Sequence, residues 1–139
     1  MKLEVYALKT CETCRRALKA LREMDGAEIV VVAYGTAGRI VQTAVKQARA
    51  EGTPVGLFRP ISMFPFPYER LAEVTKTAKH ILVVELSAGQ MIEDVALALA
   101  RSRPIHFLNR MGGMLVSPDE VVAKVKSMIE GRSEEVHIG

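Results

Sequence analysis

Two cysteines stand three residues apart near the start of the chain, at Cys11 and Cys14. They follow a short apolar run and precede a stretch of helical periodicity, which places them at the N-terminus of a helix. The helix dipole and the unpaired N–H groups there stabilise a thiolate, and Arg15 and Arg16 add positive charge beside it. The spacing predicts thiol–disulfide chemistry in which Cys11 attacks a disulfide and Cys14 resolves the mixed disulfide. A pair that serves only as scaffold is the alternative.

The three histidines are weaker candidates for chemistry. His80, His106 and His137 share no metal-ligand spacing, and a single Cys-x-x-Cys pair is weak evidence for zinc. His80 and His106 stand at the starts of predicted strands and are expected at the rim of a sheet. The sequence therefore predicts no metal site and no cofactor.

Three further positions lie where strands are expected to end. Glu85 closes an apolar run and is expected either to cap a helix or to pair with Arg110. Ser87 lacks the surroundings of a nucleophile elbow, so hydrolase chemistry is not predicted. Residues 35–38 (GTAG) lie between a strand and a helix, where N–H groups can hold a phosphate. They match neither a dinucleotide fingerprint nor a P-loop, so a structural turn is favoured.

Length and composition indicate one globular domain over residues 1–139, with 49% hydrophobic and 25% charged residues. The net charge is +3 and no run of Lys and Arg is dense, which argues against a nucleic-acid partner. The apolar runs are far shorter than the roughly 20 residues that cross a bilayer, so no membrane partner is predicted. Charges interrupt the start where a signal peptide would be apolar. A cytoplasmic protein, with homodimer formation left open, is expected.

Apolar runs of strand length alternate with helical periodicity along the whole chain. Helix starts and stops are marked by glycines and prolines, and a capping box is predicted from Ser117 to Glu120. The last nine residues are polar and are expected to form a loose tail, 131–139. Strands are predicted at residues 3–8, 28–34, 55–59, 80–86 and 104–108, and helices at about 13–25, 68–78, 90–100 and 118–130. A further helix is predicted to follow a turn at residues 35–38, to bury residues 40, 41, 44, 45 and 48, and to end at Gly52 and Pro54.

This alternation predicts a three-layer α/β/α domain with a five-stranded, mostly parallel sheet. The expected strand order is 1-3-2-4-5, with 3-2-4-5-1 as the alternative. Ligand sites of such sheets lie at the carboxyl ends of the strands, here residues 10–14, 35–39, 59–65, 86–90 and 109–113. The proline- and aromatic-rich segment 63–68 is predicted to form an exposed apolar patch of the kind that marks an interface.

Two resemblances divide the chain near residues 25–27. Residues 1–21 (MKLEVYALKTCETCRRALKAL), within a segment 1–25, resemble the opening βα unit of the thioredoxin superfamily, in particular glutaredoxin-type arsenate reductases. Four later segments are AYGTAGR at 33–39, LFRPI at 57–61 with FPFP at 64–67, VELSAGQM at 84–91 and NRMGG at 109–113. With these, residues 27–130 resemble the C-terminal domain of the 2-oxoacid:ferredoxin oxidoreductase α subunit, a relative of the transketolase C-terminal domain. The resemblance implies a role in assembly with sister subunits, with thiamine diphosphate and iron–sulfur clusters bound mainly elsewhere.

Three functional hypotheses follow from these patterns. The first is an engineered chimeric scaffold with no evolved catalytic activity. The second is a thiol–disulfide oxidoreductase that uses Cys11 and Cys14. The third is a natural assembly domain of a 2-oxoacid oxidoreductase.

The position of the cysteines predicts a difference in their reactivity. Cys11 precedes the helix, whereas Cys14 lies on its apolar face, so Cys11 is expected to carry the more reactive thiolate. Iodoacetamide should therefore alkylate Cys11 several times faster than Cys14, as measured by mass spectrometry of peptides from a time course at neutral pH. Faster alkylation of Cys14 would contradict the assignment.

Overall fold

The computed structural model of this chain describes residues 27–136 and residue 138. The strand predicted at residues 3–8, the pair Cys11 and Cys14, the thioredoxin-like opening and His137 lie outside the described residues. Within the described part, strands and helices alternate from beginning to end. They are β1 (Ile29–Ala33), α2 (Gly35–Ala50), β2 (Val55–Phe58), α3 (Tyr68–Val74), β3 (His80–Glu85), α4 (Met91–Ala98), β4 (Ile105–Asn109) and α5 (Pro118–Ile129).

The described strands form one parallel sheet in the order β2-β1-β3-β4. In the register, Val31 of β1 lies between Leu57 of β2 and Leu82 of β3. This order confirms the arrangement 3-2-4-5 predicted for the four later strands, and the α/β class with it. The sheet has four strands in the described residues where five were predicted. Because the missing strand was placed at residues 3–8, the edge that it takes stays a prediction.

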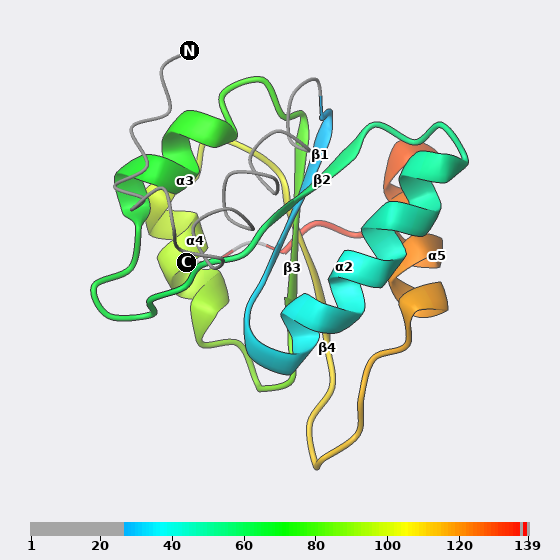
Figure 1. The fold of residues 1–139 in the computed structure, drawn as a ribbon. Helices are drawn as coiled ribbons and strands as arrows, with labels where there is room; N and C mark the ends of the chain where they lie inside the picture. Colours follow the sequence, from blue (N-terminus) through cyan, green and yellow to red (C-terminus); the bar gives the residue numbers. More distant parts are fainter. Residues whose placement is uncertain (1–26, 137, 139) are drawn as a thin grey trace, which may run out of the picture.

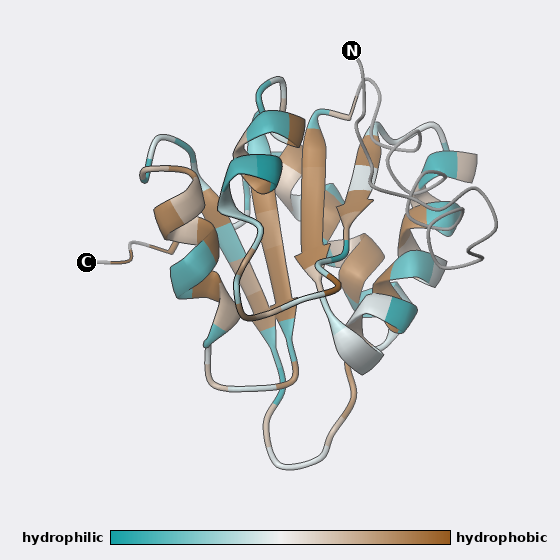
Figure 2. Ribbon diagram, turned by 60° about the vertical axis from the view of Figure 1, so that its left-hand side comes forward, coloured by the Kyte–Doolittle hydropathy of each residue, from teal (hydrophilic) through white to brown (hydrophobic). Residues whose placement is uncertain are grey.

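The sheet is covered by helices on both faces (Figure 1): α2 and α5 pack on one face, α3 and α4 on the other. Alternate residues of β1 supply the two cores, since Ile29 and Val31 face α2 and α5 while Val30 and Val32 face α3 and α4. Side chains of successive strand residues point to opposite faces, so a strand buried on both must be apolar throughout. Figure 2 shows this as strands that are hydrophobic along their length, with hydrophilic residues on the outer helix surfaces.

The predicted helix signals place the helices correctly and overestimate their lengths. α3 ends at Val74, four residues before the predicted end at residue 78, and residues 75–77 form a turn in which the Thr75 hydroxyl bonds the Leu71 carbonyl oxygen at 2.7 Å. α5 begins with the predicted capping box, in which Ser117 and Glu120 each accept the other's backbone N–H. The Phe64–Pro65 peptide bond in the β2–α3 loop is cis.

Part of the segment predicted as a loose tail lies against β4. The Val136 N–H donates to the Ile105 carbonyl oxygen at 2.8 Å. His106 Nδ1 lies 2.9 Å from the Ser133 hydroxyl and 3.0 Å from the Glu134 carbonyl oxygen. Since Ile138 packs on the α3/α4 side and Ser133 meets His106 on the other, this segment crosses the outer edge of β4.

The burial of His106 predicts a pH dependence of stability. Burial away from water lowers the pKa of His106 below its usual value, whereas in the unfolded chain the pKa is about 6.5. Between the two values the unfolded chain binds more protons, so the free energy of unfolding should fall as the pH drops below about 6.5.

Urea unfolding at pH 7.5 and pH 5.5, with EDTA present, measures this loss. His106→Gln keeps a side-chain N–H donor but does not titrate, and it should lose less stability between the two pH values than the parent chain. An equal loss in both proteins would show that His106 does not contribute.

Candidate functional site

The carboxyl ends of the strands lie at one edge of the sheet, where the loops after β1, β3 and β4 turn at the lower end of the molecule in Figure 1. In a parallel α/β sheet this is the edge at which ligands and partners bind. All four predicted segments in the described residues, 35–39, 59–65, 86–90 and 109–113, belong to it. We call it the carboxyl edge.

Glu85 is the buried centre of the carboxyl edge, with none of its surface exposed. Its two carboxylate oxygens accept the backbone N–H groups of Met91 at 2.7 Å and Ile92 at 3.2 Å, at the start of α4. The Ser87 hydroxyl donates a third bond to it at 3.3 Å. A buried carboxylate is stable only when such donors replace water, and the positive end of the helix favours the charge. Glu85 therefore caps α4, as predicted.

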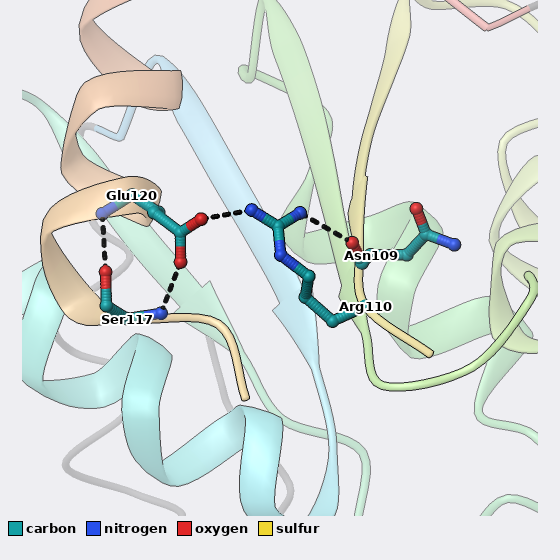
Figure 3. Close-up of polar contacts among 4 residues, drawn as sticks. All are labelled: Asn109, Arg110, Ser117 and Glu120. Atoms are coloured by element: carbon teal, nitrogen blue, oxygen red, sulfur yellow. Dashed lines mark hydrogen bonds and ion pairs between the residues drawn. The ribbon is translucent and has the colours of Figure 1, made fainter. Parts of the chain in front are cut away.

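The predicted ion pair between Glu85 and Arg110 is wrong. Arg110 contacts Glu85 only through its backbone, with its N–H 3.2 Å from the Glu85 carbonyl oxygen. Its guanidinium turns the other way, to Glu120 of the α5 capping box and to the carbonyl oxygen of Asn109 at 3.0 Å (Figure 3). The Glu85 carboxylate already accepts two backbone N–H groups and the Ser87 hydroxyl. Glu120 lies nearer the surface, where a guanidinium keeps part of its hydration.

The β4–α5 loop is held at both of its ends. At the first, the Asn109 amide donates to the Ser87 carbonyl oxygen at 3.0 Å. At the second, the Glu120 carboxylate accepts the Ser117 N–H at 2.7 Å and the Arg110 guanidinium (Figure 3). The Ser117 N–H is the main cause that lowers the pKa of Glu120, with the Arg110 charge adding to it. The carboxylate therefore stays ionised at neutral pH, and the Arg110–Glu120 contact persists.

Apolar side chains of the β4–α5 loop point away from the protein. Met111, Met114 and Leu115 are 61%, 67% and 60% exposed, whereas the neighbouring Val116 is buried. Gly112 and Gly113 between them have φ values of +74° and +78°, a conformation that other residues adopt with strain. Because its ends are held and its middle depends on two glycines, this loop presents a defined apolar surface. We call residues 111–115 the apolar loop.

The predicted apolar patch at residues 63–68 forms only in part. Phe64 is 97% exposed, and Ile61 just before the segment is 78% exposed. Phe66 is buried instead, with its ring 5.1 Å from that of Tyr68 in an edge-to-face contact. The Tyr68 hydroxyl in turn bonds Asp94 of α4. Phe66 is thus part of the α3/α4 core, while Tyr68 stays 39% exposed beside it.

The turn at residues 35–38 is filled by protein. Arg59 lies across the first turn of α2 and donates to the Gly35 carbonyl oxygen at 3.2 Å. A Cβ on Gly38 would lie 2.8 Å from Arg59 Nε, so the glycine makes room for the arginine. The preference for a structural turn over a phosphate site at residues 35–38 stays a prediction.

Among the described residues, few catalytic groups lie at the carboxyl edge. The Ser87 hydroxyl donates a hydrogen bond to the Glu85 carboxylate. No histidine of the described residues lies at this end of the sheet, because His80 and His106 lie near the starts of their strands at the opposite end. Residues 27–136 and 138 contain no group of three or more His, Cys, Asp or Glu residues that could hold a metal ion. No helix in that part of the chain is long and apolar enough to span a membrane.

Solved structures with the same fold define the class. The chain superposes on the inactive tetramer of a split-gene transketolase. The TM-score is 0.62 and the identity 21%, over 76% of this chain and 39% of that chain. It superposes on the 2-oxoglutarate:ferredoxin oxidoreductase of Magnetococcus marinus with a TM-score of 0.63 and 19% identity, over 88% of this chain and 24% of that chain. The fold is thus one shared with transketolase-like enzymes.

Sequence comparison is more specific than the fold. Residues 27–121 match the family model of pyruvate:ferredoxin oxidoreductase core domain II, and the chain belongs to this family. The ketoisovalerate oxidoreductase subunit VorB of Methanothermobacter thermautotrophicus is 43% identical over 111 residues, 80% of this chain. The 2-oxoglutarate synthase subunit KorA of Methanothermobacter marburgensis is 36% identical over 104 residues, 75% of this chain. The chain spans 31% and 28% of the lengths of these two relatives.

These findings correct the first functional hypothesis. An engineered chimera without function is not supported, because 80% of the chain aligns with a subunit of an archaeal oxidoreductase. The oxidoreductase resemblance of the later segment is confirmed at the level of the family. The thioredoxin-like opening and the roles of Cys11 and Cys14 stay predictions.

Sequence analysis missed the apolar loop and the burial of His106. The signal for the loop was present: apolar residues flank two glycines directly before the N-cap Ser117, where a loop is expected to be polar. No local signal marks the burial of His106, which depends on Ser133 and Glu134, more than 25 residues away.

The capping role of Glu85 predicts a stability effect that depends on its oxygens. Glu85→Ala leaves two buried N–H groups of α4 without a partner and should lower the free energy of unfolding by about 2–3 kcal/mol. Glu85→Gln keeps one acceptor and should cost less. Glu93→Ala, an exposed residue of the same helix, is the control and should stay within about 0.5 kcal/mol of the parent. Urea unfolding monitored by circular dichroism measures all three, and an unchanged Glu85→Ala would contradict the capping role.

Proposed function

We propose that this chain is an assembly domain of a 2-oxoacid:ferredoxin oxidoreductase, which binds the chains or domains that carry out the reaction. The proposal rests on the match of residues 27–121 to core domain II of this enzyme class. The relatives that share the domain are named as subunits of oxidoreductases. This chain spans under a third of the lengths of these two relatives.

The carboxyl edge provides the surface that such a role needs. Interfaces are rich in exposed apolar and methionine side chains on a pre-organised backbone. The apolar loop has these properties: Met111, Met114 and Leu115 are exposed, and the Arg110–Glu120 contact holds its base. An exposed apolar cluster costs a monomer solubility and is typical of a surface that a partner covers.

The cofactors of such an enzyme are proposed to reside on the partners. An ordinary iron–sulfur cluster needs four thiolates, and the whole sequence has two cysteines. Thiamine diphosphate is likewise assigned to the partner chains, where it would supply the carbanion chemistry. Among the substrates, the higher identity to the ketoisovalerate subunit makes a branched 2-oxoacid the first to test.

Thiol–disulfide exchange at Cys11 and Cys14 is a second proposal. It is supported by the spacing of the two cysteines and by the arginines beside them. The two proposals are compatible because the cysteine pair precedes the residues that match core domain II.

Co-purification tests the assembly proposal. The tagged full chain, co-expressed with the 2-oxoacid oxidoreductase subunits encoded in its own genome, should retain them through size-exclusion chromatography. The double variant Met114→Ser/Leu115→Ser should retain at least about fivefold less, because a buried apolar side chain contributes about 1.5–3 kcal/mol. Leu97→Ser is the matched control, since Leu97 is 63% exposed on α4, away from the carboxyl edge.

Failure of the parent chain to retain any of these subunits would contradict the assembly proposal. Retention by the double variant equal to that of the parent would exclude the apolar loop as the contact surface.

A further inference from the structure

Two histidines lie together at the opposite edge of the sheet, where the strands begin. His80 is the first residue of β3 and His106 the second of β4, and their ring centres lie 5.5 Å apart with planes inclined at 59°. Both share the sheet face covered by α2 and α5, because Leu82 pairs with His106 and is two residues after His80. The assembly role proposed above makes no use of this pair.

The hydrogen bonds of His106 determine which of its nitrogens carries the proton. Nδ1 lies 3.0 Å from the Glu134 carbonyl oxygen, which can only accept. Nδ1 must therefore donate, and in the neutral ring the lone pair resides on Nε2. A backbone carbonyl that orients one imidazole nitrogen and leaves the other free is the arrangement found behind histidines that bind metals.

The free nitrogens of both rings are buried and have no partner. His106 is 2% exposed, and its Nε2 has no hydrogen-bond partner within the described residues. Nδ1 of His80 is also buried and lacks a partner there. Buried polar atoms are nearly always satisfied by protein, water or an ion. Two such atoms on adjacent rings indicate one occupant shared by both.

The spacing of the rings fits a metal ion. Zinc binds imidazole nitrogen at about 2.0–2.1 Å, and two rings on one tetrahedral ion have their centres roughly 5 Å apart. The observed 5.5 Å between the ring centres is close to that spacing. Water would complete the coordination.

The charges around the pair are balanced. Lys124 of α5 acts on His106 as a positive charge and Glu135 as a negative one, and both lie close enough to influence its pKa. Glu135 therefore offsets the repulsion that Lys124 exerts on a cation, and neutral imidazole suits a divalent metal of the zinc class.

We propose that His80 Nδ1 and His106 Nε2 together bind a divalent transition-metal ion of the zinc class at the amino edge of the sheet. Binding joins β3 to β4 and fixes the ring of His106, which in turn holds Ser133 and Glu134. The metal therefore stabilises the contact of residues 133–136 with the edge of β4. It is structural, with no role in the reaction.

Zinc and cobalt titrations test the site. The parent for these measurements carries Cys11→Ser and Cys14→Ser, so that the cysteines cannot bind the metal. Calorimetric titration of this full-length protein with zinc chloride should give one site, and cobalt(II) should give the visible absorption of nitrogen and oxygen ligands without a thiolate band. His106→Gln and His80→Gln should each weaken zinc binding by at least about tenfold.

Limited proteolysis gives a second measurement. Cleavage after Glu134 and Glu135 by a glutamate-specific protease should slow severalfold on addition of zinc in the parent and remain unchanged in His106→Gln. The control variant is His137→Gln, which should retain more zinc affinity than His106→Gln.

An absence of zinc binding to the parent would overturn the proposal and leave a bridging water as the occupant of the pair. Binding that is lost in His137→Gln and kept in His106→Gln would also overturn it. Neither result depends on the assembly function, which co-purification tests separately.

Discussion

The two central strands are buried on both faces, and this constraint decides where function can reside. Every residue of β1 is at most 1% exposed, and β3 is buried from Ile81 to Glu85. Side chains there must be apolar, because an unpaired polar group costs several kcal/mol in such a place. Polar groups are therefore displaced to the strand ends. Glu85 is the last residue of β3, where backbone N–H groups of α4 donate the hydrogen bonds that water would otherwise supply.

The same constraint explains how much of the fold was predictable. Continuous β-branched runs such as 29–33 predicted strands covered on both faces, and the four later strands and their order are confirmed. Helix ends were less predictable, because no glycine or proline marks the end of α3 at Val74. Glu85 was placed correctly as a cap, but the partner of Arg110 was not: Glu120 satisfies both the capping box and the guanidinium. Whether one carboxylate can bind both groups depends on the path of the β4–α5 loop.

The candidate site was predictable in location and less so in composition. The carboxyl edge follows from a parallel sheet, and aromatic residues drew attention to the β2–α3 loop. Phe66 is buried there because α3 and α4 leave space for its ring, so Phe64 alone remains fully exposed. The β4–α5 loop, with aliphatic in place of aromatic side chains, proved the more consistently exposed. At the other end, His106 is buried because residues 133–136 return over it.

That returning segment also changes how this sheet meets other proteins. An open edge strand offers a row of unpaired N–H and C=O groups on which a foreign strand can add, and long exposed edges lead to aggregation. Here the Val136 N–H donates a hydrogen bond to the Ile105 carbonyl oxygen, and the chain passes from one face of the sheet to the other at that point. A foreign strand is thereby blocked from the amino-terminal half of β4. At Ile105 the protein's own backbone therefore stands where an added strand would pair.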